Sequence, residues 1–563
     1  MQHTNPQGIS LNTFAIKSIL FDQRDHDLIR IVNSVYDADA RLGYIRKLYY
    51  PFFHPLGIKE LAESKGLHTA YAIVNLLESM ERGVIENRLA ALRALKDEVL
   101  DTADGPMPKN TARVLLQIMK ELVRAKGKDA RQLQLAHNFR LAAFGKPRVI
   151  RKLLSHYHLL EMPEEWNQIT FDDHVHDANT SGRKSPTHLI MDAWIKGIRR
   201  LRVIYYHYIE PRFALELIEA AKIMEIDLRI GIEFKARYRN HYISFIWVAR
   251  GLADAEAFLC FLAEPHVVEF MDQGKAVLQL QKKHVLGLLK TFNEAHLDDM
   301  CRDLDITMAA LSPDEFLQFS SPGQPSVPHL AEYIHKMAVL AMKKRLDELH
   351  EIFNRSDAQK QEEIKARIEK MDCFSARDII ETYLHPEQHP DIFALSAENG
   401  RSKIPDRLKM NHTRFLETIT QLHYDFRLTL KLGNLQPEDV LEILYESKGL
   451  ITRLEIINLK DFVSGKTDHV FSINELQKAI NGGSVLKLKR SVRQIISCVE
   501  KTDYPDRSDR LKKLFNILYD INALKNMYAA YPLKSRIGSD STGKAHQAHG
   551  MGFGIVTTLP YRS

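Results

Sequence analysis

Two histidines one residue apart stand in the segment FDDHVHDANTSGRKSP, residues 171–186. In a β-strand, alternate side chains point to the same face, so His174 and His176 can reach one ion while Val175 packs on the other face. Neutral imidazoles combined with carboxylates suit zinc, manganese or iron. The same two histidines also fit a polar loop, and the surrounding elements must decide between these interpretations.

The segment begins a region where strands and helices alternate. Strands are expected at 169–174, at 201–206 and in IDLRIGIEF, and helices are expected to begin after the N-cap Ser185 and at Pro211. This alternation at about 30-residue intervals is typical of a parallel α/β sheet or barrel.

The chemistry of such folds lies at the carboxyl ends of the strands, where the loops converge over one face. His174, His176, His207 and Glu233 all fall at these expected strand ends. Their shared position favours a metal site over a polar loop.

These segments resemble the polymerase and histidinol phosphatase (PHP) superfamily of metal-dependent phosphoesterases. The similarity covers residues 170–345 and 425–555. One segment, SPGQPSVPHLAEYI, is similar to the branch that dephosphorylates nucleotides or trims short oligonucleotides. The other similar segments are DDHVHDANTSGRKSP, VIYYH, IDLRIGIEF, TRLEIIN and SRIGSDSTG.

The resemblance implies an α/β fold, a distorted (β/α)7 barrel that holds one to three divalent ions of manganese, zinc or iron. It implies that His207 serves a neighbouring ion and that His329 faces the substrate phosphate, so that Asp540, His207 and His329 form the catalytic set. The first metal position would comprise His174, His176, Glu233 and Asp540.

The chain departs from the family pattern at several strand ends. Tyr206 replaces an aspartate ligand and Thr542 replaces the closing histidine. The histidine expected near Ser244 is absent, with His241 the nearest, and DFRLTLKLGN lacks the usual His-Pro. One metal position is therefore complete, and the others lack ligands.

Several basic residues are candidates for substrate binding. Arg183, Lys184, Lys235 and Arg237 lie just past strand ends, although a solvated surface is the simpler explanation for them. Lys544 lies in GSDSTGKA, which is one residue short of a phosphate-binding loop because Ala545 replaces the hydroxyl residue. The glycine-rich sequence that follows cannot form the required helix, which disfavours an NTPase and leaves Lys544 as a possible phosphate contact.

Four regions are expected. Residues 1–165 predict an N-terminal helical domain, in which GIKELAESKGLHTAYAIVNLLESM fits a helix-turn-helix or, more simply, two packed helices. Residues 166–280 and 421–563 predict the two parts of the barrel. Residues 281–420 predict a helical insertion over the barrel mouth.

Composition limits the partners. The net charge of +6 arises from 78 basic and 72 acidic residues that are mixed along the chain, so nucleic acid is possible but not indicated. Four widely spaced cysteines predict reduced, mostly buried thiols. No apolar run reaches the ~18 residues of a membrane span. Together with the reduced thiols, this predicts a cytoplasmic protein without membrane contact. The oligomeric state stays open.

Two functions are compatible with these features. The first is a metal-dependent hydrolase, a phosphoesterase that uses a metal-activated water on a small phosphorylated or nucleotide-like substrate. The second is a degenerate barrel that binds a phosphorylated ligand or a protein partner without turnover. The set His174, His176, Glu233 and Asp540 favours the first, and Tyr206 and Thr542 favour the second.

Overall fold

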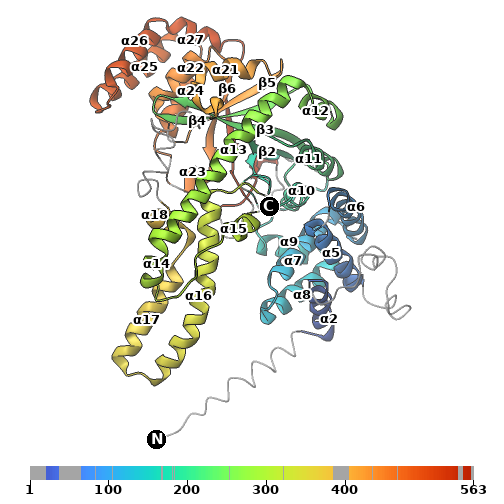
Figure 1. The fold of residues 1–563 in the computed structure, drawn as a ribbon. Helices are drawn as coiled ribbons and strands as arrows, with labels where there is room; N and C mark the ends of the chain where they lie inside the picture. Colours follow the sequence, from blue (N-terminus) through green and yellow to red (C-terminus); the bar gives the residue numbers. More distant parts are fainter. Residues whose placement is uncertain are drawn as a thin grey trace.

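The structure is a computed structural model of the full chain. It describes residues 21–36, 65–384 and 405–558, except for residues 83, 104, 166–168, 181, 183, 253, 321–322, 434, 464, 466 and 543–548. Figure 1 shows a curved sheet surrounded by helices, a group of N-terminal helices beside it, and a long helical projection.

The N-terminal region is helical throughout its described part. Its helices pack against α10 (Pro186–Ile195) and α11 (Pro211–Ile223), and their apolar residues join the core of the sheet region in one continuous cluster. The first part of the possible helix-turn-helix lies outside the described residues. The helices are α2 (Gln23–Tyr36), α5 (Lys65–Arg82), α6 (Ile85–Thr102), α7 (Pro108–Arg124), α8 (Asp129–Ala143) and α9 (Pro147–His156).

Buried polar contacts fix these helices to the sheet region. Arg113 of α7 donates from Nε to the carbonyl oxygen of Ile195 at 2.7 Å. Asp192 of α10 pairs with Lys120 and with Lys184. Arg88 of α6 forms a bidentate pair with the buried carboxylate of Glu216 on α11.

The sheet has eight strands in the order β7-β6-β5-β4-β3-β2-β1-β8. The β3–β4 pair and the β4–β5 pair are antiparallel, so β4 interrupts the strand–helix alternation of a regular (β/α)7 barrel. The strands are β1 (Thr170–Val175), β2 (Arg200–Tyr206), β3 (Asp227–Tyr238), β4 (His241–Ala249), β5 (Phe426–Lys431), β6 (Ile451–Asn458), β7 (Lys534–Gly538) and β8 (Phe553–Gly554).

The sheet closes on itself at its carboxyl end. The first half of β1 pairs with β8. Beyond that point the neighbour changes, because the Asp540 amide donates to the His174 carbonyl oxygen at 2.8 Å and the His176 amide donates to the Ser541 carbonyl oxygen at 3.0 Å. The chain that follows β7 therefore lies directly beside β1, which gives an α/β fold with a barrel-like sheet.

The sequence-derived elements agree with these strands and helices in their central parts. Ser185 accepts a hydrogen bond from the His188 amide as an N-cap, and Pro186 and Pro211 are the first residues of their helices. Glu233 instead lies in the middle of a long strand, because β3 continues into the hairpin with β4. Further helices around the sheet are α12 (Ala255–Leu262), α22 (Pro437–Glu446), α23 (Leu459–Val463), α24 (Val470–Asn481), α25 (Val485–Lys501), α26 (Arg507–Tyr519) and α27 (Ile521–Met527).

The helical insertion has its own apolar core, formed by residues between Val285 and Leu384. Its long helices project away from the sheet (Figure 1). The described elements of the insertion are α13 (Pro265–Thr291), the π-helical turn η1 (Phe292–His296), α14 (Leu297–Asp303), α15 (Pro313–Ser320), α16 (Val327–Arg355), α17 (Ala358–Cys373) and α18 (Ala376–Tyr383).

Two boundaries of this insertion differ from those expected. The boundary at 280 falls inside α13, which runs without interruption from the sheet region into the projection. Residues after 405 form α20 (Asp406–Lys409) and α21 (His412–Thr420), and α21 places Phe415 in the main core, where it packs against Phe234 of β3. Residues 406–420 thus belong to the barrel rather than to the insertion.

The loop before α16 contacts the barrel beside β1. The Gln324 amide donates to the Thr180 carbonyl oxygen at 3.1 Å, and Gly323 packs against the carbonyl oxygens of Ala178 and Thr180. The insertion is thereby anchored to the loop that follows β1.

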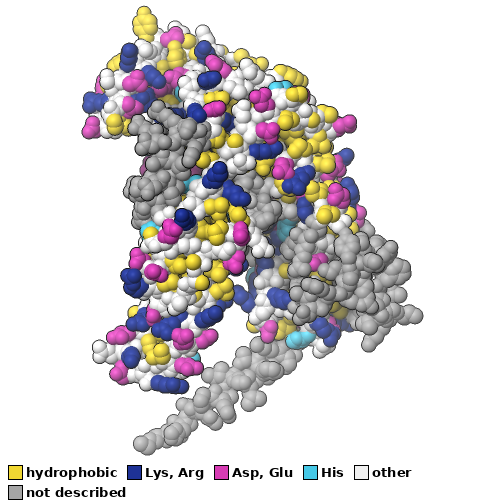
Figure 2. Space-filling model, viewed as in Figure 1, with side chains coloured by type: hydrophobic (Ala, Val, Ile, Leu, Met, Phe, Trp, Pro, Cys, Tyr) yellow, Lys and Arg dark blue, Asp and Glu magenta, His cyan; other side chains and the backbone are white. Residues whose placement is uncertain are grey.

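On the face shown in Figure 2, basic and acidic side chains are interspersed over the insertion and the sheet region. The expectation of mostly buried thiols is wrong, because Cys260, Cys373 and Cys498 are exposed and Cys301 is half-buried. Among the described helices, none combines the length and apolarity needed to span a membrane.

Candidate metal centre

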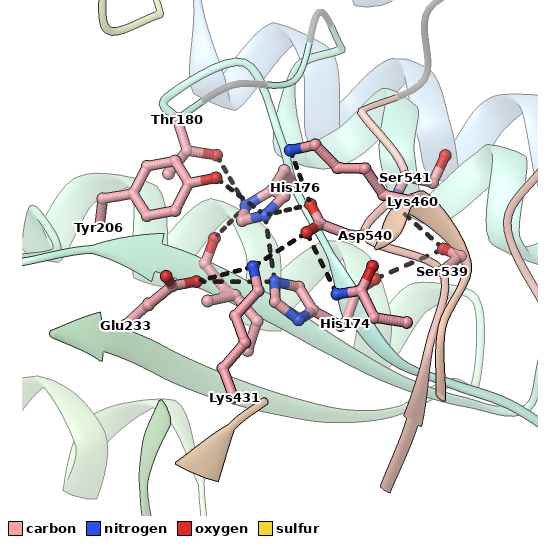
Figure 3. Close-up of polar contacts among 12 residues, drawn as sticks. His174, His176, Thr180, Tyr206, Glu233, Lys431, Lys460, Ser539, Asp540 and Ser541 are labelled. Atoms are coloured by element: carbon pink, nitrogen blue, oxygen red, sulfur yellow. Dashed lines mark hydrogen bonds and ion pairs between the residues drawn. The ribbon is translucent and has the colours of Figure 1, made fainter. Parts of the chain in front are cut away.

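Side chains from strands far apart in the sequence meet at the carboxyl end of the sheet (Figure 3). His174 belongs to β1 and His176 follows it, while Asp540 lies two residues after β7. One nitrogen of each histidine and one oxygen of Asp540 lie within 4.8 Å of one another, and all three residues are buried. This convergence follows from the closure of the sheet between β7 and β1.

Hydrogen bonds fix both imidazoles in one orientation. Nδ1 of His174 lies 2.6 Å from Oε1 of Glu455, and Nδ1 of His176 lies 2.9 Å from the carbonyl oxygen of Ile204. Because both partners accept, each neutral ring carries its proton on Nδ1 and a lone pair on Nε2. The two Nε2 atoms face each other at 3.2 Å.

Asp540 adds a third acceptor to the same point. Its Oδ1 lies 3.2 Å from Nε2 of His176 and is buried without a hydrogen-bond donor. The backbone there is left-handed, with φ +52°, which is uncommon for a residue other than glycine and is found at functional sites. Asp540 Oδ2 accepts from Asn458 Nδ2 at 3.2 Å and from Lys431 Nζ at 3.0 Å.

Acceptors that face one another require a positive charge between them, either a proton or a cation. Ligand atoms bound at ~2.0–2.1 Å to one tetrahedral zinc ion lie about 3.3 Å apart. The two separations of 3.2 Å at His176 therefore match the spacing of metal ligands. The Glu455–His174 hydrogen bond is also the kind of contact that orients a metal-binding histidine.

Glu233 of β3 lies at the edge of this group. Its Oε2 is 3.9 Å from Nε2 of His174 and 3.5 Å from Nζ of Lys431. This oxygen accepts no hydrogen bond in the described structure. Burial would raise the pKa of this carboxyl, but Lys431, His174 and a hydrogen bond from Ser244 together outweigh it and lower the pKa to about 2. The structure thus places Glu233 beside the three-residue group rather than within it.

Lys431, the last residue of β5, is the principal feature that sequence reasoning missed. Burial opposes the charge of its ammonium, but Asp540, Glu233 and Glu455 raise its pKa well above the ordinary value. The ammonium therefore stays charged among the carboxylates of the site. Its position was detectable from sequence, since it ends a strand as Glu233 was expected to, but only a histidine was sought there.

Buried groups below the site hold β1 and β7 together. The Asp172 carboxylate accepts from the amides of His174 at 3.1 Å, Ser539 at 3.0 Å and Gly552 at 2.8 Å. A Cβ atom at Gly538 would lie 2.3 Å from Cβ of His174, so that only glycine permits this approach of the two strands.

Tyr206 stands beside His176, where the family pattern has an aspartate. Its hydroxyl lies 3.2 Å from Nε2 of His176, and the two rings lie 4.8 Å apart. Thr180 Oγ1 also lies 3.3 Å from His176, at Nδ1 (Figure 3). Tyr206 therefore contributes a neutral hydroxyl where a second ion would need a carboxylate.

The other expected site residues lie around this centre. His207 is buried with φ +62°, and burial, with the charges of Arg407 and Lys235, lowers its pKa to about 3. It is outside the three-residue group. His329 is the third residue of α16, with Nδ1 3.0 Å from both the Gln324 carbonyl oxygen and Ser326 Oγ.

The basic candidates have different positions. Lys184 pairs with Asp192 between the N-terminal helices and α10, which is a structural contact. Arg237 is exposed in the outer part of β3, with Nε 3.4 Å from the carbonyl oxygen of Arg239. Arg183 and Lys544 lie outside the described residues. Lys460 of α23, which we did not anticipate, lies with Nζ 3.7 Å from Asp540 Oδ1 and is half-exposed.

Comparison with known proteins identifies no family for this chain. No protein-family model matches the chain, and no curated protein sequence matches it. Its structure is similar to that of a protein assigned as a metal-dependent phosphoesterase from Bifidobacterium adolescentis, with 13% identity and a TM-score of 0.31, over 69% of this chain and 92% of the other. It is also similar to an amidohydrolase from Chromobacterium violaceum with bound sulfate and no metal, with 12% identity and a TM-score of 0.34, over 54% and 82%. These scores are too low to carry an argument.

Proposed function

We propose that this chain is a metal-dependent hydrolase, a phosphoesterase that acts on a small phosphorylated or nucleotide-like substrate. The observation that carries the proposal is the meeting of three buried acceptor atoms, Nε2 of His174, Nε2 of His176 and Oδ1 of Asp540. Zinc, manganese or iron suits this combination of imidazoles and carboxylate.

A divalent ion held by these residues would supply a more acidic bound water and a positive charge next to a phosphoryl oxygen. The chain's own residues have separate tasks. Glu455 holds His174 in the tautomer that exposes Nε2. Lys460, half-exposed beside Asp540, would bind a non-bridging phosphate oxygen.

We infer one ion for each chain, at the lower end of the range of one to three that the PHP resemblance implies. The Lys431 ammonium already lies among the Asp540 and Glu233 carboxylates, where it supplies the positive charge that a second ion would bring. The neutral hydroxyl of Tyr206 removes a carboxylate ligand from the same side. Both residues make a second ion unfavourable.

The test combines metal content with turnover. Untagged protein is analysed for metals and assayed with nucleotides and other small phosphoesters in zinc, manganese or iron(II). We expect one ion per chain and metal-dependent phosphate release. Asp540→Asn should lower both metal affinity and turnover at least tenfold, because the site loses its charged ligand, whereas Lys544→Ala should have a smaller effect.

A matched control is Asp439→Asn, since Asp439 is also buried but pairs with Arg510 on α26. It should keep its metal. Protein that binds no metal under any of these conditions, or turnover of ATP that needs magnesium and Lys544, would overturn the proposal.

One observation favours the alternative of a barrel that binds a ligand without turnover. Lys431 occupies part of the space between Asp540 and Glu233, and its ammonium gives these carboxylates a partner without any metal. A stoichiometric metal with no turnover over a broad panel of phosphoesters would support this second candidate.

A further inference from the structure

The opposite end of the barrel carries a concentration of arginines. Each strand from β2 to β7 supplies at least one, and β4, which runs antiparallel, supplies its arginine just after its last residue, at the same end. We call these seven residues the arginine cluster: Arg200, Arg202, Arg229, Arg250, Arg427, Arg453 and Arg536.

The arginines are close enough to repel one another. Burial and the charges of Arg536, Arg427 and Arg202 lower the pKa of Arg453 to about 9. Burial, partly offset by Asp173, lowers the pKa of Arg202 to about 10. Burial and other arginines of the cluster also lower the pKa of Arg427 and of Arg536, so the side chains form one group with a shared field.

Too few carboxylates face this group to balance it. Asp173 lies 3.4 Å from Arg202 and 3.3 Å from Arg536. Asp227 pairs with Arg229 at 3.4 Å, and Asp425 pairs with Arg250 at 3.4 Å. Seven arginines thus meet three carboxylates in these ion pairs, which leaves an excess of positive charge at this end of the barrel.

Buried donors in the cluster also lack acceptors. Nε of Arg202, Nε of Arg453 and Nε of Arg536 are inaccessible to solvent and have no hydrogen-bond partner in the described structure. Arg202 and Arg453 are 7% and 5% exposed. Buried guanidinium donors without acceptors are unfavourable, and an anion would satisfy them.

The exposure of the cluster indicates the size of that anion. Arg200, Arg229 and Arg250 are exposed, Arg427 and Arg536 are half-buried, and Arg202 and Arg453 are buried. The buried and the exposed arginines together could hold a small ion, whereas a nucleic-acid backbone would contact the exposed ones alone.

An apolar layer separates this end from the metal centre. Ile204, Ile246 and Val248 form a buried cluster of their own inside the barrel, next to Gly231. Ile204 lies between Arg202 and Tyr206 on alternate residues of β2, so that the two ends of the barrel carry separate polar groups.

We propose that the arginine cluster binds a small, multiply charged anion, a chain of phosphate groups such as inorganic triphosphate or the triphosphate of a nucleotide. Guanidinium groups match phosphate oxygens in bidentate geometry, and several of them around one site favour an anion with several charges. The site is distinct from the proposed phosphoesterase centre and does not depend on it.

The test is calorimetric titration of metal-stripped full-length protein with inorganic triphosphate and, separately, with ATP in the presence of EDTA. We expect saturable binding of triphosphate with one site per chain, and a concentration-dependent rise in Tm. Equal affinity for ATP would show that the phosphates alone are recognised, and tighter binding of ATP would show that the nucleoside adds contacts. Both results support the proposal.

Variants locate the site. Arg453→Gln and Arg427→Gln should each weaken triphosphate binding about tenfold or more, because each removes a charge-assisted contact. Asp173→Asn should strengthen binding, because it removes the carboxylate that competes for Arg202 and Arg536. Because misfolding would not strengthen binding, a gain in Asp173→Asn would show that the losses in the arginine variants come from the charges of the cluster. Arg407→Gln is the matched control, since Arg407 is buried but stacks on Phe270 instead.

Lys460→Met distinguishes this site from the metal centre. Triphosphate binding that disappears in Lys460→Met but persists in Arg453→Gln would place the anion at the metal centre and overturn the proposal. Absence of binding at millimolar triphosphate, or stronger binding of a single-stranded oligonucleotide than of triphosphate, would also overturn it.

Discussion

The Lys431 ammonium lies 3.0 Å from Oδ2 of Asp540, inside the group of carboxylates that would otherwise face a metal ion alone. A half-buried cation at this distance neutralises the carboxylate and competes electrostatically with any ion bound through Oδ1. The carboxylates of the site are therefore already partly neutralised, which favours a single bound ion over a cluster of two or three.

Replacing Lys431 should reveal this competition. Lys431→Met keeps the aliphatic volume and removes the charge, so we expect zinc or manganese to bind at least tenfold more tightly, measured by calorimetry. Lys460→Met is the matched control, because the Lys460 side chain is 49% exposed, with Nζ 3.7 Å from Asp540, and solvent screens its charge. Weaker metal binding in Lys431→Met would show that the lysine organises the ligands instead.

Glu455 tests the orientation of His174. Glu455→Gln can still accept the Nδ1 proton but loses the charge that polarises the ring, and such changes next to a ligand weaken metal binding by about 10- to 100-fold. Titration with zinc measures the effect. Glu442→Gln, at a buried carboxylate that pairs with Arg239 and Lys513, should leave zinc binding unchanged. Equal losses in both variants would mean that stability, not orientation, is responsible.

The sequence predicted the parts of the site that depend on one strand. His174 and His176 follow from strand alternation, and the positions of β1, β2 and β3 follow from their apolar runs and from the caps at Ser185 and Pro211. The site lies at strand ends because that is where the loops of such sheets converge.

The parts that depend on contacts between distant strands were not predictable in this way. That β7 lies beside β1 is set by the Asp172 carboxylate and by the close approach at Gly538, neither of which has a local pattern. The entry of Lys431 depends on β4, which pairs antiparallel with both β3 and β5 and so brings the carboxyl end of β5 to the same edge of the sheet as Glu233. Lys431 was missed because a cation was not expected among metal ligands.

Gly538 should be intolerant of any side chain. In Gly538→Ala the new Cβ would meet Cβ of His174 at 2.3 Å, so the strands must separate. We expect a loss of about 1–3 kcal/mol in the free energy of unfolding together with weaker metal binding. Gly127→Ala, at an open position with φ +83°, controls for backbone strain. It should cost about 1 kcal/mol and leave the metal in place, whereas Gly538→Ala with unchanged metal affinity would contradict the close approach of β7 to β1.

The attachment of the N-terminal helices depends on Asp192, which pairs with both Lys120 and Lys184 in a buried setting. Asp192→Asn leaves these ammonium groups without a counterion, and breaking a buried pair in this way costs about 3–5 kcal/mol. Urea denaturation measures the loss, and hydrogen exchange should show that α7 and α10 open first. The control is Asp299→Asn, because the Asp299–Arg302 pair is exposed and should contribute less than about 1 kcal/mol. A change of that small size in Asp192→Asn would mean that the apolar core, shared between these helices and the sheet region, holds the two together without help from the ion pairs.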